Sequence, residues 1–436
     1  MPSVPHSKRG LTGVILLLSA CLPLSGQAMP LAQAVMAGLS INPKVRLALA
    51  EAERAGIEVS MSKSGYLPSL TVSAGPELSR MAQPGYDITA SQMLYDWGRV
   101  ASEVESANAT HRKYLHALLV AQDDSALNII EIYLDVLASR ERIKTVKAHI
   151  HALNDIEQLT TVRDAQGYSD RSELERTRLE LSRAQEQLAI EEGSLQEADE
   201  QYHILVGQPA RDLIMPHPPS LKKSLASKDL NQVIDNSPLL KKAKAEVDVS
   251  KAALQKTKAA LLPQLNLEAT ALRRETGGRM DNDTVVSLRF RMDTLQGLSN
   301  FQRPLAAARQ LEASQWQRDT THRDIRRQLQ TLLDNTNTLK TRIKSLTQQM
   351  KTAHEVIELY KTQFEVGHRD VIDLLNVQRE QFEVERQLIN SQIEQKRLNY
   401  RAAAQIGFLP HLLEENRKDG NIKHMDRSLS RFVEEK

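Results

Sequence analysis

The sequence predicts a mostly α-helical fold with two β-hairpins, arranged as two internal repeats. The 436 residues include only two Trp, six Phe and nine Tyr, which argues against several compact cores because aromatic side chains normally supply much of a core's buried area. Two stretches of almost 70 residues nearly lack Gly and Pro, which favours long helices. Four shorter stretches alternate apolar and polar residues, which is typical of strands.

The N-terminus, residues 1–28, has the features of an export signal. Lys8 and Arg9 precede an apolar run over 11–20, and residues 26–28 read Gly-Gln-Ala, a cleavage site of the small-x-Ala type. Removing these two positive charges from the 57 basic residues leaves 55, equal to the 55 acidic residues. A neutral mature chain argues against a nucleic-acid binder, which normally carries a basic surplus.

Cys21 is the only cysteine and has two interpretations. The stretch from Leu18 to Cys21 resembles a lipobox, in which the thiol takes lipid and becomes the mature N-terminus. Alternatively, Cys21 is a small residue within a signal that is later removed. Cleavage after Ala28 favours the second interpretation, because a lipid anchor normally leaves a longer tether before the first helix. The mature chain then has no thiol or disulfide chemistry.

The first sign of a repeat is a pair of proline spacings. Pro43 and Pro68 are 25 residues apart, as are Pro238 and Pro263, and the two pairs are offset by 195 residues. Each gap is poor in Gly and Pro and rich in Ala, Lys and Glu, which predicts a helix of about six turns. The second proline of each pair ends that helix.

Each proline pair is followed by two alternating stretches, which predict hairpins at about 66–96 and 263–296. In the first hairpin, Leu70, Val72 and Ala74 are the apolar positions of the first stretch, and the second stretch is Ile88–Leu94. In the second hairpin the apolar positions are Leu265, Leu267, Ala269, Val286, Leu288, Phe290 and Met292. Polar loops are expected at 75–85 and 273–283. Strands of about ten residues suit a tilted bilayer crossing, although alternation alone fits a soluble hairpin equally well.

A very long helix follows each hairpin and returns at a glycine. The predicted long helices are 98–166 and 298–366, and the returning helices are 168–206 and 368–406. Gly167 and Gly367, 200 residues apart, mark the two turns. A helix of about 68 residues is roughly 100 Å long, so it requires a coiled-coil or helical-barrel setting.

Apolar residues in the second long helix follow a heptad pattern, which predicts a left-handed supercoil. The positions are Ile343, Leu346, Met350, Ala353, Ile357, Tyr360 and Phe364. The first long helix keeps this pattern for four positions, Ile143, Val146, Ile150 and Leu153, and then loses it. We therefore expect the two helix pairs to differ near their ends.

These elements divide the mature chain into a first repeat at 29–230, a second repeat at 231–408 and a charged tail at 409–436. A proline-rich linker at 208–230 is expected to pack as a belt around the middle of the helices. Beyond the signal no apolar run reaches 18 residues, so a transmembrane helix is not expected.

The four predicted strands cannot form a membrane barrel within one chain, because an open sheet edge is not tolerated in lipid. If the hairpins lie in the membrane, closure requires oligomerisation. Two chains give eight strands, which form a barrel whose interior is filled by side chains. Three chains give twelve strands, which enclose a lumen, and their helices would continue it as a tube.

Several motifs together resemble the TolC family of bacterial outer-membrane channels over roughly residues 30–408. They are Asn42-Pro43, Leu67-Pro68, Leu262-Pro263, the stretch Leu94–Arg99, and Phe364–Leu375 followed by Gln378. The resemblance implies a homotrimer in which a 12-stranded barrel contacts outer-membrane lipid and an α-helical barrel extends into the periplasm. It also implies docking to a periplasmic membrane-fusion adaptor and an inner-membrane pump.

The stretch Tyr95–Arg99 looks more like the type I secretion branch of this family than the drug-efflux branch. On this basis an ABC transporter is expected as the pump and an exported protein as the substrate. A multidrug efflux component is the alternative within the family. A periplasmic coiled-coil adaptor or scaffold that never enters the outer membrane is the alternative from a different class.

The resemblance also identifies a pore constriction at the turn around Gly367. Asp373 falls on the family's first constriction aspartate, and Arg369 on the arginine of the network that holds the pore closed. Asn376 falls on the second aspartate and departs from the pattern. Three copies of one carboxylate around an axis attract cations. The alternative is helix capping by Asp370, with Asp373 in the favoured first turn.

The first-repeat turn carries matching residues. Asp170 and Glu173 have the same offsets from Gly167 as Asp370 and Asp373 have from Gly367. They are expected at the periplasmic tip and in contact with the adaptor, or else in a solvated first helical turn. At the other end Tyr95 and Trp97 are expected either to anchor the membrane interface or to pack at the strand–helix junction.

Enzyme signatures are missing from the sequence. It contains neither a phosphate-binding loop of the G-x-x-x-x-G-K type nor an H-E-x-x-H motif. His149 and His151 are two residues apart and diverge on a helix, so the histidines are interpreted as surface residues. No metal, cofactor or nucleotide site is expected, and the channel is expected to be passive and driven by a partner.

Overall fold

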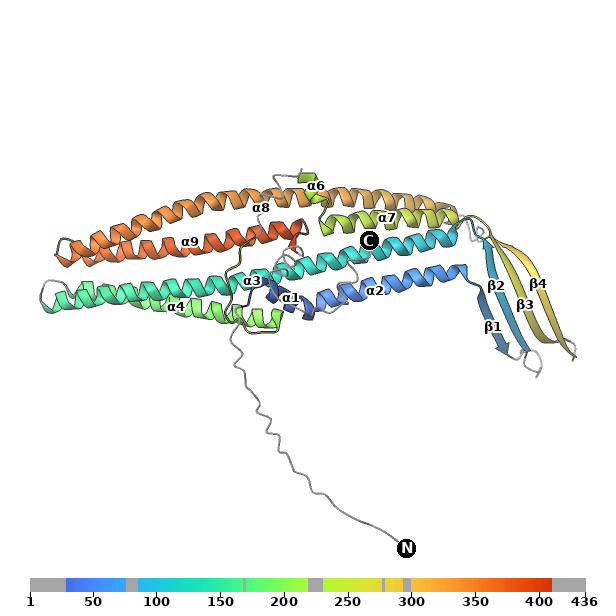
Figure 1. Ribbon diagram of the computed structural model, residues 1–436, viewed down its shortest axis with the longest axis horizontal. Helices are drawn as coiled ribbons and strands as arrows, with labels where there is room; N and C mark the ends of the chain where they lie inside the picture. Colours follow the sequence, from blue (N-terminus) through green and yellow to red (C-terminus); the bar gives the residue numbers. More distant parts are fainter. Residues whose placement is uncertain are drawn as a thin grey trace, which may run out of the picture.

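The computed structural model describes residues 29–75, 85–167, 170–218, 230–276, 279–292 and 299–409. The expected export signal with Cys21, the linker residues 219–229 and the tail beyond residue 409 lie outside these ranges. The described chain is mostly helical and carries one small antiparallel sheet, as the composition and periodicity predict. It forms an elongated rod with the sheet at one end (Figure 1).

Within the described ranges, the first part of the chain contributes four α-helices, a short 3-10 helix at Ser64–Tyr66 and two strands. In order, the α-helices and strands are α1 (Leu31–Ile41), α2 (Pro43–Lys63), β1 (Ser69–Gly75), β2 (Gly85–Tyr95), α3 (Arg99–Ala165) and α4 (Arg171–Val206). Helix α2 begins where the proline spacing predicts, because Pro43 occupies the first turn and the Asn42 side chain accepts hydrogen bonds from the Lys44 and Val45 backbone N–H groups.

The second part repeats this order. It comprises α6 (Leu230–Ile234), α7 (Pro238–Ala259), β3 (Gln264–Thr276), β4 (Arg279–Arg291), α8 (Ser299–Glu365) and α9 (Val371–Gln405). Helices α3 and α8 have 67 residues each. Pro304 is accommodated inside α8 close to its start. No helix in the described ranges combines enough length with enough apolar character to span a bilayer.

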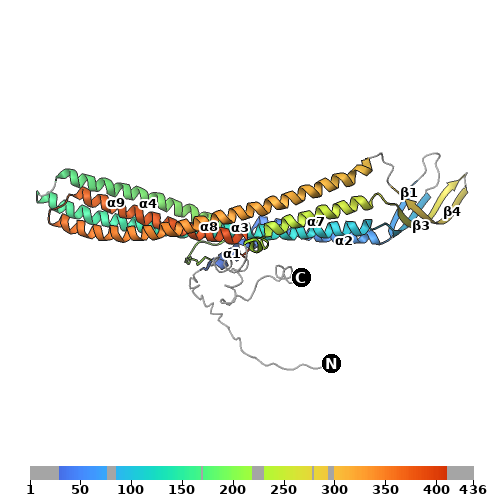
Figure 2. The ribbon, with the colours of Figure 1, turned by 90° about the horizontal axis from the view of Figure 1, so that it is seen from above.

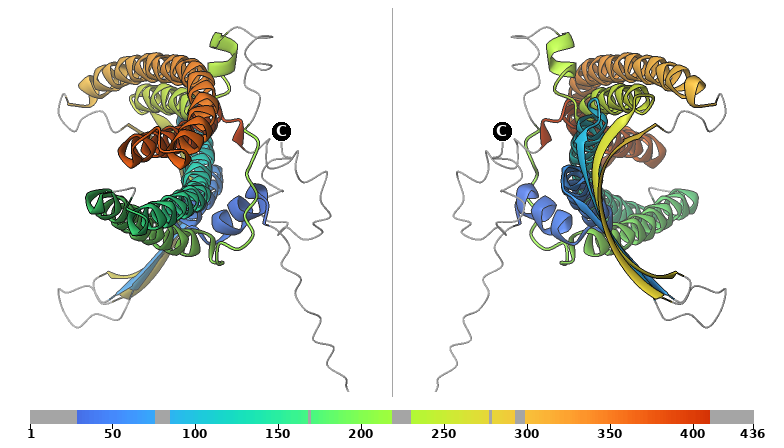
Figure 3. Two further views of the ribbon diagram at one scale, coloured as in Figure 1. Left: turned by 90° about the vertical axis from the view of Figure 1, so that its left-hand side faces the viewer. Right: turned by 90° about the vertical axis from the view of Figure 1, so that its right-hand side faces the viewer.

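The helices pack in pairs along the rod. Helix α4 returns along α3 and α9 returns along α8, while α2 and α7 accompany the halves of α3 and α8 nearer the sheet (Figures 1 and 2). Helix α3 also contacts α7 and α9, so it joins the two parts. Seen end-on, the helices form a curved layer (Figure 3).

The predicted heptad pattern of α8 coincides with the surface that it buries. Leu346, Ile357 and Phe364 are buried, Phe364 completely. Helices α8 and α9 pack along this seam. The seam ends at the turn between the two helices, so it positions the residues of that turn.

The strands pair in the order β1-β2-β3-β4, all antiparallel. The first predicted loop, at 75–85, falls on residues 76–84, which lie outside the described ranges. The second prediction is wrong, because the expected loop at 273–283 is mostly strand: pairing continues from Arg273 with Asn282 to Thr276 with Arg279. The apolar alternation stops before the backbone pairing does, since the ladder requires only peptide groups.

The sheet has one apolar and one polar face. Ala90, Ala269 and Val286 are direct partners on the first face, and Ser91, Glu268 and Ser287 are direct partners on the second. The apolar face is uncovered in the single chain: Leu70 is 68% exposed, Val286 67% and Phe290 74%. A face of this kind requires lipid or another protein surface to cover it.

The main core lies at the middle of the rod, where α1 and the described part of the linker cross α3. The hydroxyl of Tyr133 lies 2.7 Å from the Ile214 carbonyl oxygen and 3.0 Å from the Met29 carbonyl oxygen, which share its single proton, and it accepts a hydrogen bond from the Ile214 N–H. Lys396 on α9 donates to the Pro216 carbonyl at 3.1 Å. The described linker residues thus connect both helix pairs at this level.

Candidate functional site

The candidate site is formed by the two helical turns at the end of the rod farthest from the sheet (Figure 1). Gly167 ends α3 with φ +75° and Gly367 ends α8 with φ +77°. A Cβ atom at either glycine would meet no atom within 4 Å. The left-handed backbone, rather than crowding, is therefore what requires glycine at these two positions.

The turn between α8 and α9 closes with backbone hydrogen bonds. The Gly367 N–H donates to the Phe364 carbonyl at 3.0 Å, and the His368 N–H donates to the Gln363 carbonyl at 2.9 Å. These bonds satisfy carbonyls that would otherwise be unpaired at the end of a helix. The turn therefore holds the next residue, Arg369, close to the last turn of α8.

Arg369 joins the end of α8 to the start of α9. Its Nη1 donates to Asp373 Oδ2 at 2.9 Å, and its Nε donates to Gln363 Oε1 at 3.0 Å. The guanidinium also lies 4.1 Å from the ring centroid of Tyr360, a cation–π distance. The hydrogen bond with Asp373 raises the pKa of Arg369 further, so the side chain remains charged at all physiological pH values.

Asp370 and Asn376 make different contacts from Asp373. Asp370 occupies the N-cap position of α9 with φ −84° and ψ 153°, but its side chain accepts no capping hydrogen bond. Asn376 Oδ1 accepts a hydrogen bond from Arg379 Nη2 at 3.0 Å. Arg379 also lies 3.9 Å from Glu180 on α4. Asn376 is therefore connected toward the first helix pair, whereas Asp373 is bonded within its own turn.

The turn between α3 and α4 is followed by a helix that the Asp170 side chain caps. Asp170 Oδ1 accepts a hydrogen bond from the Ser172 N–H at 3.2 Å, which caps α4 in the usual way. Glu173 lies in the first turn of α4, and its N–H donates to the Asp170 carbonyl at 2.9 Å. Residues 168 and 169 lie outside the described ranges.

The two turns are tied together by a contact that the sequence analysis missed. Arg163, near the end of α3, donates from Nη1 to the Phe364 carbonyl at 2.8 Å, and its guanidinium lies 4.5 Å from the Phe364 ring centroid. Phe364 is fully buried in an apolar cluster. The cluster also contains Leu153, Ile156, Ala184, Val371, Leu374 and Leu375. Heptad spacing identifies Phe364 as buried but gives no partner 201 residues away.

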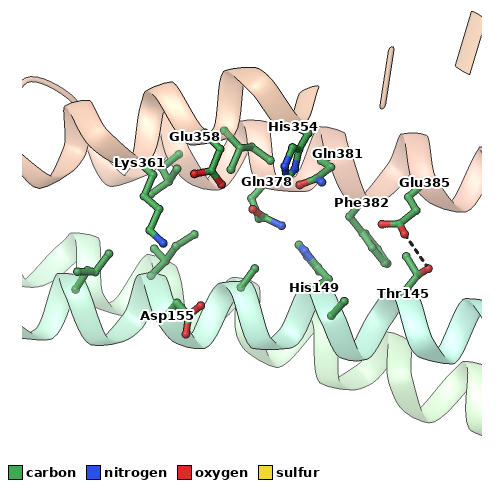
Figure 4. A pocket seen from close by; sticks show the side chains of 16 residues that line it. Thr145, His149, Asp155, His354, Glu358, Lys361, Gln378, Gln381, Phe382 and Glu385 are labelled. Atoms are coloured by element: carbon green, nitrogen blue, oxygen red, sulfur yellow. Dashed lines mark hydrogen bonds between the residues drawn. The ribbon is translucent and has the colours of Figure 1, made fainter. Parts of the chain in front are cut away.

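A cavity of about 270 Å³ lies between α3, α8 and α9, on the sheet side of the two turns (Figure 4). His149 on α3 stacks on Phe382 of α9, with ring centroids 4.3 Å apart and planes 7° apart. Its Nδ1 is buried without a hydrogen-bond partner. The prediction that the histidines are surface residues is therefore wrong for His149, because α9 covers this face of α3.

Burial lowers the pKa of His149 to about 4, although the charge of Glu180 opposes this shift. His149 is thus neutral at pH 7. His354 and Glu358 of α8 also line the cavity. Within the described residues, no group of three or more His, Cys, Asp or Glu side chains could hold a metal ion.

At the opposite end, Tyr95 and Trp97 lie where β2 passes into α3. Their rings meet edge to face with centroids 4.9 Å apart, and they are 54% and 52% exposed. Trp97 has a φ of +57°. Asp96 between them is buried and accepts hydrogen bonds from the Gly98 N–H at 3.0 Å and the Val100 N–H at 2.6 Å. Asp96, which the sequence analysis did not single out, thus joins the end of β2 to the first turn of α3 between the two exposed aromatics.

Comparison with known proteins gives a consistent result for nearly the whole described chain. A family model described as "Outer membrane efflux protein" matches residues 37–208 and 230–403. The outer membrane protein TolC of Vibrio cholerae serotype O1 is 20% identical over 372 residues, which cover 81% of this chain and 85% of that protein.

Solved outer-membrane proteins share the fold. The outer-membrane channel OprN has a TM-score of 0.75 at 18% identity, covering 86% of this chain and 89% of that chain. VceC from Vibrio cholerae has a TM-score of 0.75 at 15% identity, covering 86% and 96%. CmeC, an outer membrane channel of Campylobacter jejuni, has a TM-score of 0.73 at 14% identity, covering 89% and 88%.

Proposed function

The chain belongs to the outer membrane efflux protein family, and from this premise we propose that it forms a passive trimeric channel across the bacterial outer membrane. Members of this family are channel proteins of the outer membrane with a large helical periplasmic part.

The two-faced sheet is the observation that carries this proposal. Its apolar face is exposed at Leu70, Val72 and Phe290, among other positions, and lipid is the environment that such a band suits. The polar face would then line a water-filled lumen. The helices attached to the same end of the sheet would extend that lumen into the periplasm.

Closure of the sheet supports a trimer. Within the described chain β1 and β4 each have one edge without a strand partner, and lipid does not tolerate open edges. Pairing β1 of one chain with β4 of the next removes both edges. Three chains give twelve strands, enough to enclose a lumen.

The helical turns around Gly167 and Gly367 are then the periplasmic entrance. Asp373 and Asn376 form the proposed constriction, Arg369 holds it, and Asp370 lies beside them. Arg369 contacts Gln363, Asp373 and Tyr360 within one turn, so it fixes the position of the Asp373 carboxylate. We place a periplasmic adaptor against both tips, with Asp170 and Glu173 on the first tip among its contacts.

The energy source is proposed to be a partner, an inner-membrane pump that the adaptor joins to the channel. The family description favours efflux as the transport function of the channel. Protein export by a type I system with an ABC transporter is the second candidate, because the Tyr95–Arg99 stretch resembles that branch. The family assignment argues against the third alternative, a periplasmic coiled-coil adaptor or scaffold.

Assembly is tested on the full-length protein expressed in a bacterial host. We expect it in the outer-membrane fraction, as an oligomer of three chains that dissociates on heating in detergent. We also expect ion-conducting pores in planar bilayers. A purely soluble periplasmic pool, or an oligomer of another size, would contradict the proposal.

Cargo is tested by deleting the gene and restoring it from a plasmid. Loss of drug or dye export with normal protein secretion supports efflux. Loss of secreted proteins with normal drug sensitivity supports the type I system. An Asp373→Ala variant should restore transport with altered ion permeation, which separates the role of the entrance from that of assembly.

A further inference from the structure

The polar face of the second hairpin carries a compact charged group. Glu268 on β3 is only 5% exposed, although it lies in the middle of a single-layer sheet. Its Oε1 accepts a hydrogen bond from Arg291 Nη2 at 3.0 Å, and its Oε2 lies 3.0 Å from Arg289 Nε. The two arginine side chains remain 58% and 61% exposed. We refer to Glu268, Arg289 and Arg291 as the arginine belt.

Strand register fixes where this group lies. Gln264 pairs with Arg291, Asn266 with Arg289 and Glu268 with Ser287. These pairs lie at the end of the hairpin that adjoins α7 and α8 (Figure 1). Side chains at alternating positions share one face of a sheet, so all three residues of the arginine belt lie on the polar face.

The rest of the described polar face carries opposite charge at its other end. Asp87 and Asp283 are both partners of Leu272, near the hairpin connections. Toward the helices, the first hairpin carries only uncharged residues on this face: Ser69 and Ser91, which are paired with each other, and Met93, the partner of Asn266. Positive charge is therefore concentrated at the helical end of the second hairpin.

Resting on the proposed channel, we infer that the arginine belt is an anion-selecting ring in the lumen where the barrel meets the helical tunnel. Glu268 balances one arginine, so each chain contributes one net positive charge and a trimer contributes three. The bases of the arginines are fixed by Glu268 while their guanidinium groups remain accessible. Fixed charges in a narrow lumen raise the local concentration of the opposite ion, here chloride or the carboxylate and phosphate groups of cargo.

The buried carboxylate has a positioning role in this ring. A carboxylate that is nearly excluded from water requires compensating charge, and the two arginines supply it. Glu268 in turn holds both guanidinium groups on one short stretch of the lumen wall. Without Glu268 the arginines would have no common anchor, but their charge would remain.

The experiment measures reversal potentials of single channels under a potassium chloride gradient. We expect the double variant R289Q/R291Q to lower the chloride-to-potassium permeability ratio by about two- to fivefold. E268Q should raise the same ratio, because it removes a negative charge from the same place. The charge-preserving R289K/R291K should stay within the wild-type range.

The matched control is R273Q. Arg273 lies on β3 but on the opposite face, since it alternates with the residues of the arginine belt and pairs with Tyr86. R273Q removes one positive charge from the same hairpin and should leave the ratio unchanged. The shifts of the belt variants should also shrink in 1 M salt, where the screening length falls to about 3 Å.

Opposite shifts in R289Q/R291Q and E268Q, with R273Q unchanged, support the ring. If R289Q/R291Q fails to assemble, E268Q alone tests the ring: a raised permeability ratio supports it, and a lowered or unchanged ratio contradicts it. If the wild type conducts but neither R289Q/R291Q nor E268Q shifts the permeability ratio, the inferred role of the arginine belt is wrong and the proposed channel function stands. A wild type that forms no pore would overturn the proposed function itself.

Discussion

The two helical turns at the entrance share a backbone but differ in how their side chains hold it. Each has a left-handed glycine, Gly167 at φ +75° and Gly367 at φ +77°, and each has an aspartate at the N-cap of the returning helix. In the first turn Asp170 makes the capping hydrogen bond. In the second turn Asp370 does not, and Arg369 instead joins Asp373 to α8.

This difference shows which features of a repeat are determined by the residues of the turn itself. Glycine and the N-cap position set the reversal of the chain in both copies. The side chains nearby are free to take separate roles once that reversal is secured. We therefore expect the first turn to behave as a structural cap and the second as a charged constriction that its own arginine holds in place.

The largest expected effect is on the stability of the protein and involves His149, which packs on Phe382 where α3 of the first helix pair meets α9 of the second. Its pKa is about 4 in the folded protein and ordinarily 6.5. Between these pH values the unfolded chain binds a proton that the folded chain does not. Stability should therefore fall as pH decreases from about 6.5 to about 4, by up to roughly 3 kcal/mol per chain.

Thermal unfolding at pH 7.5 and pH 4.5 measures this effect. Phenylalanine at position 149 keeps the stack on Phe382, so His149→Phe should lose less stability on acidification than wild type. His151→Phe is the control, because the His151 side chain is 80% exposed. Equal acid sensitivity of wild type and His149→Phe would contradict the assignment.

The next largest effect should be the same in both turns. Gly167→Ala and Gly367→Ala should each destabilise the protein by about 1–2 kcal/mol, because an L-residue is strained in the left-handed region. Gly193→Ala, within α4 and with open space around a Cβ, should instead be neutral or stabilising. Chemical denaturation measures all three, and a clear inequality between the two turns would show that their backbones are not equivalent.

Ion permeation should distinguish the turns more directly. Asp373→Ala removes the partner of Arg369, and we expect it to widen or deregulate the entrance and to weaken block by divalent cations about fivefold. Glu173→Ala, at the matching place in the first turn, should change block less than twofold. Single-channel recording in planar bilayers measures both, and an unchanged conductance and cation block in Asp373→Ala would count against the constriction.

The smallest effect separates the two caps. Asp170→Ala loses a capping hydrogen bond and should cost about 1 kcal/mol, whereas Asp370→Ala should cost only a few tenths. Hydrogen exchange in the first turns of α4 and α9 should report this locally. Faster exchange in α9 than in α4 after the equivalent substitutions would reverse the assignment.

Local signals in the sequence were sufficient for much of the fold. Proline spacing located the starts of α2 and α7, and period-two alternation located the strands and their apolar face. The glycines at 167 and 367 marked both turns. These features depend on neighbouring residues alone, so a single chain read in order reveals them.

The candidate site was less predictable. Family resemblance singled out Arg369 and Asp373, and the structure brings them within 2.9 Å of each other, although their role in a constriction stays a prediction. The resemblance said nothing of Arg163 or His149. The extension of β3 and β4 through 273–283 was also missed, because alternation reports burial of side chains and not backbone pairing.

The sequence by itself therefore determined the elements: two copies of a helix, a hairpin and a long helical return, with an apolar strand face and glycine turns. Only the tertiary structure decided which elements meet. Arg163 reaches Phe364, and His149 stacks on Phe382, across more than 200 residues of chain. Periodicity is set by short-range backbone geometry, whereas these contacts depend on how α3 packs against α8 and α9, which no local pattern encodes.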